Sequence, residues 1–122
     1  MKKKSKIFIV EWELFPFDVL VCLGCPHSDI LKWIKRTGYN LNETEIESIN
    51  GPGLGRTTML EGGQTILWTR ECPRLGSPVL AHEIFHAVSF LAHRVGFKLT
   101  EESDEVFAYA IQHLTQKINE KI

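Results

Sequence analysis

Residues 81–87 of the chain read Ala-His-Glu-Ile-Phe-His-Ala, and the rest of the sequence can be interpreted outward from this stretch. His82 and His86 are four residues apart, so on a helix their side chains lie on the same face. Two imidazoles in this arrangement can bind one metal ion, most plausibly zinc. Glu83 follows the first histidine, and a carboxylate close to a metal ion can take a proton from metal-bound water. The spacing therefore predicts a metal site with an acid–base residue beside it.

The residues around this motif predict that it lies on a helix. Ser77 and Pro78 are typical of an N-cap followed by proline at the first helical position, and Gly96 is typical of a helix end. The predicted helix is about 18 residues long. Its apolar surface is expected to be buried and comprises Val79, Leu80, Ile84, Phe85, Ala87, Val88, Leu91, Ala92 and Val95. The alternative is an ordinary amphipathic helix on which the histidines and the glutamate bind nothing.

Length, composition and charge restrict the class of protein. The chain has 122 residues, 43% of them hydrophobic, and a net charge of −1. These values predict one domain, residues 1–122, with a small core and no nucleic-acid partner. The apolar run at 7–10 is too short for a signal peptide, and no run is long enough to cross a membrane. We therefore expect a cytoplasmic protein with no membrane partner; the sequence does not predict its oligomeric state.

Three cysteines, Cys22, Cys25 and Cys72, are an odd number and argue against a disulfide framework. Cys22 and Cys25 form a C-x-x-C pattern. Three interpretations are open: reduced structural thiols, which we favour, a redox pair, or half of a zinc site completed by His27 and Cys72.

Local patterns predict the other elements of the chain. Residues 7–15 and 17–23 are expected to form two neighbouring strands, with Val10, Trp12 and Leu14 on one face of the first. Ser28 is a candidate N-cap for a helix that ends at Gly38. Asn42 to Glu45 resembles a capping box before a short helix. Residues 56–60 and 65–70 flank Glu61-Gly62-Gly63-Gln64 and are expected to form a hairpin.

The last predicted helix begins after Thr100, a candidate N-cap. Its buried side is expected to comprise Val106, Phe107, Ala110, Ile111, Leu114 and Ile118. Taken together, the elements predict an α+β fold in which helices pack on a small, mainly antiparallel sheet.

The sequence resembles the gluzincin type of zincin metallopeptidase, in particular the small kind encoded in phage and prophage genomes. The resemblance rests on His82-Glu83-x-x-His86 and on Glu105-Val106-Phe107-Ala108-Tyr109. In gluzincins a glutamate on the helix after the motif helix is the third zinc ligand, and a small residue often follows it by three positions. The resemblance implies a zincin-like fold and a Zn2+ ion held by His82, His86 and Glu105. It also implies hydrolysis of a peptide or protein substrate with Glu83 as the catalytic base.

Several of these roles have alternatives. Glu102 and Asp104 compete with Glu105 as third ligand, because acidic residues also suit the start of a helix. Tyr109 could donate a hydrogen bond to a developing oxyanion, or could simply lie half-buried between two helices. The other histidines are weaker candidates: His93 lies on roughly the same face as His86, and His113 and His27 are expected at the surface. In zincins an edge strand binds the substrate as an added strand, and residues 66–69 are the expected counterpart.

Two other functions remain open. The protein could be a catalytically inactive zinc-binding interaction or regulatory protein, or an interaction domain without metal. Water in the fourth coordination position of zinc favours an enzyme, whereas a fourth protein ligand favours a structural role.

Overall fold

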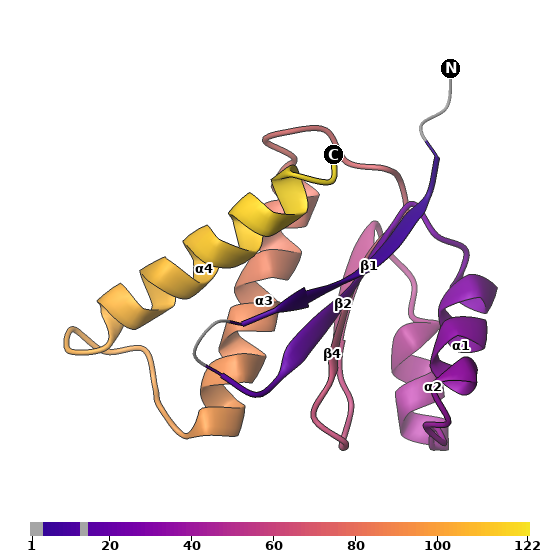
Figure 1. Cartoon of the computed structure of the whole chain (residues 1–122), viewed down its shortest axis with the longest axis horizontal. Helices are drawn as coiled ribbons and strands as arrows, with labels where there is room; N and C mark the ends of the chain where they lie inside the picture. The colour runs from indigo at the N-terminus through magenta and orange to yellow at the C-terminus, as the bar shows by residue number, and fades with distance from the viewer. Residues whose placement is uncertain (1–3, 13–14) are drawn as a thin grey trace.

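A computed structural model describes residues 4–12 and 15–122 of the chain, and within them it shows an α+β arrangement (Figure 1). The elements are, in order, β1 (Lys6–Glu11), β2 (Asp18–Leu23), α1 (His27–Arg36), α2 (Glu43–Ile49), β3 (Gly55–Met59), β4 (Thr65–Thr69), α3 (Pro78–Val95) and α4 (Asp104–Asn119). Each predicted strand and helix has a counterpart. Leu14, predicted to share one face of the first strand with Val10 and Trp12, lies outside the described residues.

The sheet has the strand order β1-β2-β4-β3. β1 pairs with β2 and β3 pairs with β4 in the antiparallel sense, but β2 and β4 are parallel. The sheet is therefore mixed, where the sequence predicts a mainly antiparallel one. The parallel pairing follows from the long connection through α1, α2 and β3, which returns the chain to the end of the sheet at which β2 began.

Residues 66–69 do not form an edge strand, so this prediction from the zincin resemblance is wrong. β4 pairs with β2 on one side and with β3 on the other, and every residue of β4 is buried. A continuous buried run is typical of an internal strand. β1 and β3 lie at the edges of the sheet, so β3 is the edge strand next to the motif helix.

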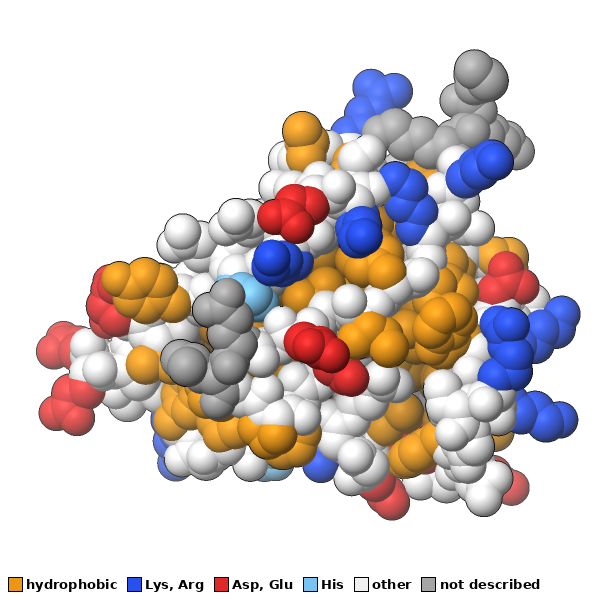
Figure 2. Space-filling model, viewed as in Figure 1, with side chains coloured by type: hydrophobic (Ala, Val, Ile, Leu, Met, Phe, Trp, Pro, Cys, Tyr) orange, Lys and Arg blue, Asp and Glu red, His pale blue; other side chains and the backbone are white. Residues whose placement is uncertain are grey.

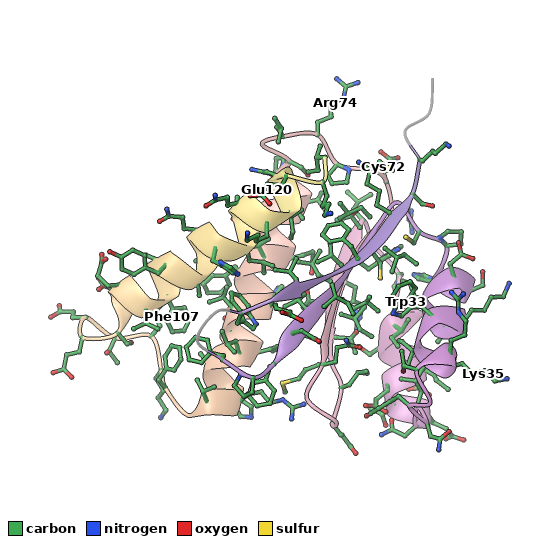
Figure 3. All side chains as sticks on the ribbon, in the orientation of Figure 1. Trp33, Lys35, Cys72, Arg74, Phe107 and Glu120 are labelled. Atoms are coloured by element: carbon green, nitrogen blue, oxygen red, sulfur yellow. The ribbon has the colours of Figure 1, made fainter. Side chains whose placement is uncertain are left out.

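Helices cover both faces of the sheet, α3 and α4 on one face and α1 and α2 on the other (Figure 1). Because side chains of a strand alternate between faces, β2 contributes to both cores. Val19, Val21 and Leu23 pack with α3 and α4, whereas Leu20 and Cys22 pack with α1. Trp33 lies between α1 and the sheet (Figure 3). This three-layer arrangement fixes α3 firmly against β3 and β4.

Local capping signals define α3 and α2 as the sequence predicts. The Ser77 hydroxyl accepts a hydrogen bond from the Leu80 amide at 3.2 Å, and Gly96 ends α3 with φ of +87°. Asn42 and Glu45 form the predicted capping box of α2.

Two other predicted caps are wrong. The N-cap of α1 is Pro26, which has an extended backbone, and the helix begins at His27. Ser28 therefore lies inside the helix and is not its N-cap. α4 begins at Asp104 because the Thr100 amide bonds to Ser103 and folds residues 100–103 into a separate turn. Val106, predicted to be buried, is 41% exposed, whereas its neighbour Phe107 faces the core.

On the face shown in Figure 2, hydrophobic side chains gather where β1 lies, between charged ones. A groove of about 600 Å³ lies here between β1 and α4, lined among others by Phe8, Trp12 and His113. The motif residues do not line this groove. Within residues 4–12 and 15–122, no helix is long and apolar enough to cross a membrane.

Candidate metal centre

The two motif histidines lie on the outer side of α3. One side of this helix packs against β3 and β4, and another side packs against α4. Leu80, Ile84 and Val88 occupy the core-facing positions and are buried. His82 and His86 lie about half a helical turn away from them, so His82 is exposed and His86 is half-buried. The amphipathic pattern of α3 thus presents the histidine pair to solvent.

The two imidazoles converge through one nitrogen each. Nε2 of His82 and Nε2 of His86 are 3.1 Å apart, and the ring planes are inclined by 74°. Two nitrogens bound to one tetrahedral zinc ion, each at about 2.0–2.1 Å, would lie roughly 3.3–3.4 Å apart. The donor atoms of the pair therefore fit a shared metal ion. The distance also fits a hydrogen bond from a protonated to an unprotonated ring nitrogen.

Glu83 is buried between α3 and β3, with 5% of its surface exposed. The Thr57 hydroxyl donates to its Oε1 at 2.8 Å and lies 3.2 Å from its backbone oxygen. Its Oε2 faces Gly55, where an added Cβ would lie 3.0 Å away. Among the described residues, no Lys, Arg or His forms an ion pair with Glu83. Burial of a carboxylate without a cation is unfavourable unless hydrogen bonds offset the loss of water.

Glu105 does not join the histidine pair in this structure. It is exposed in the first turn of α4, as are the competing Glu102 and Asp104 nearby. α4 begins beside the C-terminal end of α3, where the Phe107 and Phe97 rings lie 5.4 Å apart, and then runs back along α3 (Figures 1 and 3). His82 lies near the other end, about 20 Å from Val95 along the axis. In the described part of the chain, no three His, Cys, Asp or Glu side chains form a group that could hold a metal ion.

The remaining histidines and Tyr109 lie in different surroundings. Tyr109 is 66% exposed, so it is not half-buried between helices. His93 is exposed on α3. His113 Nε2 lies 2.8 Å from the Glu11 carbonyl, and the His27 ring lies 4.4 Å from Trp68. His113 and His27 are both half-buried, so the expectation that they are surface residues is wrong.

The cysteines form thiols rather than a disulfide. Cys22 and Cys25 are buried where β2 leads into α1, and a hydrogen bond with Cys25, together with burial, raises the pKa of Cys22. The same hydrogen bond lowers the pKa of Cys25. Cys72, on the loop between β4 and α3, packs against Gly24 (Figure 3). Among the residues that the structure describes, these thiols and His27 do not form a group of three metal ligands either.

Thr57 and Gly55 are parts of the site that the sequence analysis does not identify. They lie on β3, far from the motif in the sequence, and only the alternation of the strand places both on one face. Comparisons of the chain with family models, curated proteins and solved structures gave no match. The resemblance to gluzincins therefore rests on the motif residues alone.

Proposed function

We propose that the protein is a zinc-dependent metallopeptidase of the zincin type. One observation carries this proposal, namely that the Nε2 atoms of His82 and His86 converge to 3.1 Å beside a buried Glu83. This arrangement contains two neutral nitrogen donors and one carboxylate on neighbouring positions of a rigid helix. Metal-assisted hydrolysis of a peptide bond uses such donors and such a base together with a third protein ligand.

The roles of the side chains follow from their chemistry. Zinc, when bound, polarises the substrate carbonyl and makes water acidic. His82 and His86 hold the ion through Nε2. Glu83 accepts a proton from the attacking water and passes it to the leaving amine, which requires a carboxylate within hydrogen-bond distance of both. Tyr109 is proposed to donate to the oxyanion; it is exposed on α4 and would have to reach the site from there.

The third ligand is proposed to be Glu105, because a catalytic zinc site has three protein ligands. This role requires the beginning of α4 to approach His82 and His86. Glu105→Gln should weaken zinc binding by at least about tenfold, because even the loss of a residue that only orients a ligand typically costs 10–100-fold in metal affinity. Glu101→Gln, an exposed change outside α4, is the matched control and should leave zinc affinity unchanged. Equal affinities for both variants would remove Glu105 from the site.

We propose that the substrate is an extended peptide that pairs with the free edge of β3. Edge strands offer unpaired backbone groups to an added strand, and β3 lies beside the motif helix. A pocket of about 330 Å³ lies at the end of the sheet where β3 begins, and it is lined partly by Leu54 and Val79. Val79 is one helical turn before Glu83, so this pocket could receive an apolar side chain of the substrate close to the site.

Zinc content is the first test of the proposal. The purified protein should contain close to one zinc per chain, as measured by elemental analysis after mild purification. His82→Ala and His86→Ala should each remove the ion, whereas Glu83→Gln should retain it. A zinc content near zero that added zinc does not restore would refute the metal site.

Peptide cleavage is the second test. A diverse peptide library should be incubated with the wild-type protein and with Glu83→Gln, and the products read by mass spectrometry. We expect cleavages that a chelator blocks and that the variant lacks. Equal cleavage by the variant would identify a contaminating peptidase.

A zinc-binding interaction protein is the second candidate, and it is favoured by the position of Glu105 away from the histidines. In that case a partner would supply the missing ligands. Zinc binding without any cleavage, combined with a fourth protein ligand in a metal-bound structure, would establish this function instead.

A further inference from the structure

The two faces of β3 contact different helices. Thr58 Oγ1 lies 2.7 Å from Ser48 Oγ of α2. Gly55 and Thr57 are turned the other way, toward α3: Thr57 bonds to Glu83, and a Cβ at Gly55 would meet Glu83 and Val79. Because side chains alternate along β3, the strand presents to α3 the hydroxyl of Thr57 and, at Gly55, a position without a side chain.

The Thr57 hydroxyl has one proton and two acceptors within reach. Oε1 of Glu83 is at 2.8 Å and the Glu83 backbone oxygen is at 3.2 Å. The shorter contact goes to the carboxylate, which is the stronger acceptor when ionised. This bond holds Oε1 against β3 and turns Oε2 toward Gly55.

We propose that Thr57 is the positioning residue for Glu83: its hydroxyl holds Oε1 and thereby fixes the orientation of the carboxylate between α3 and β3. The inference rests on the proposed function, in which Glu83 is the base. It adds a residue on β3 that fixes the orientation of this base.

The geometry gives this positioning a consequence for substrate binding. A glutamate side chain has three rotatable bonds, so a carboxylate without a fixed partner loses its orientation or turns to solvent. β3 fixes Glu83 through Thr57 and, as the edge strand, would also pair with the substrate backbone. The same five-residue strand, Gly55–Met59, thus sets the base and the scissile bond relative to each other. A change at Thr57 should lower kcat with little effect on KM.

The experiment compares Thr57→Val, which removes the hydroxyl but keeps the shape, with Thr57→Ser, which keeps the hydroxyl. Thr58→Val is the matched control, because it removes a hydroxyl bond on the opposite face of the same strand. We expect Thr57→Val to lower kcat about tenfold, the effect of losing one hydrogen bond to a charged group, at unchanged KM and zinc content. Thr57→Ser should restore kcat, and Thr58→Val should leave it unchanged.

A second measurement does not depend on activity. Crystal structures of wild type and Thr57→Val should show the Glu83 carboxylate in place in the first and displaced in the second. In the wild-type background, Glu83→Gln should shift the NMR signal of the Thr57 methyl group. If Thr57→Val fails to fold, this shift and the kcat of Thr57→Ser decide the question.

The outcomes separate the two proposals. An unmoved carboxylate in Thr57→Val, or an equal loss of kcat in Thr58→Val, would overturn the role of Thr57 while cleavage by the wild type still supports the peptidase. No cleavage by the wild type would overturn the proposed function and, with it, the catalytic consequence. The crystal structures would then still determine whether Thr57 holds Glu83.

Discussion

Two glutamates are buried to the same degree in this protein, and their surroundings differ. Glu45 and Glu83 are each 5% exposed. Glu45 accepts hydrogen bonds from the Asn42 amide, the Glu61 amide and the Tyr39 hydroxyl, so its burial is explained by the cap that it forms. Glu83 has only the Thr57 hydroxyl as a donor among the described residues. The capping box accounts for the burial of Glu45, whereas Glu83 has no comparable set of donors, which is one reason for proposing it as the base.

Gly55→Ala tests the space that Glu83 occupies. The new Cβ would lie 3.0 Å from Glu83 Cγ and Oε2 and from Val79 Cγ1, which is closer than an ordinary contact, so these packed side chains must shift. We expect a loss of about 1–3 kcal/mol in the free energy of unfolding, measured by urea denaturation. The control is Gly51→Ala, whose Cβ would meet the movable side chain of exposed Arg56 and should have a smaller effect. Equal effects would mean that Glu83 can move aside.

Glu45→Gln should make the free energy of unfolding less dependent on pH in the acidic range. Burial raises the pKa of Glu45, but the hydrogen bonds from Asn42, Glu61 and Tyr39 together bring it below the ordinary 4.5. Because the pKa is lowered on folding, the stabilisation is present above 4.5 and is lost as the pH falls through the pKa of the folded state.

Urea denaturation of wild type and Glu45→Gln measures this effect. We expect the variant to be about 1–2 kcal/mol less stable at neutral pH, with a difference in stability that narrows as the pH falls below 4.5. Glu47→Gln, exposed on the same helix, is the control. A gap that stays constant with pH would contradict a role of the Glu45 charge.

At the level of elements, local signals predict well where the neighbouring residues alone decide the outcome. Ser77, Pro78 and Gly96 determine the two ends of α3, and Asn42 with Glu45 determines the start of α2. Contacts distant in sequence decide two other features, one of which was predicted wrongly and one of which was missed. β4 is internal because β2 pairs with it from across two helices, and Thr57 reaches Glu83 across a strand–helix interface.

The same distinction between features decided by neighbouring residues and features decided by distant contacts applies to the positions of the candidate ligands. The i, i+4 spacing of His82 and His86 is sufficient to predict their convergence, because a helix fixes it. The position of Glu105 depends on the turn at 100–103 and on how α4 packs on α3. Residues 105–109 alone predict neither this turn nor this packing.

Chelation tests whether a metal ion links α3 to α4. If Glu105 joins the histidines, bound zinc connects the two helices and stabilises the folded state. Removal of zinc by a chelator should then lower the melting temperature by several degrees. Glu105→Gln should reduce this difference, whereas Glu101→Gln should not. An unchanged melting temperature, with zinc shown to have left, would mean that the apolar core to which both helices contribute, for example through Val88 and Leu114, holds them together.

At the scale of the whole molecule, the sheet consists of two antiparallel pairs joined along one parallel line of hydrogen bonds. β1 and β2 form one pair, and β3 and β4 the other. The pair β3/β4 is followed directly by α3, so Thr57, His82, Glu83 and His86 all belong to the continuous stretch 55–95. Glu105 lies outside this stretch.

This topology has a consequence for the order of folding. Each antiparallel pair closes a short loop, but the pairing of β2 with β4 must bring together segments separated by α1, α2 and β3. Loop closure over a long separation is slow, so we expect this step to limit the rate. Pulse-labelling hydrogen exchange during refolding should show the amides between β3 and β4 protected before those between β2 and β4. The motif helix and its supporting strand would then assemble first, and the remaining layer of the protein would be added to a site already formed.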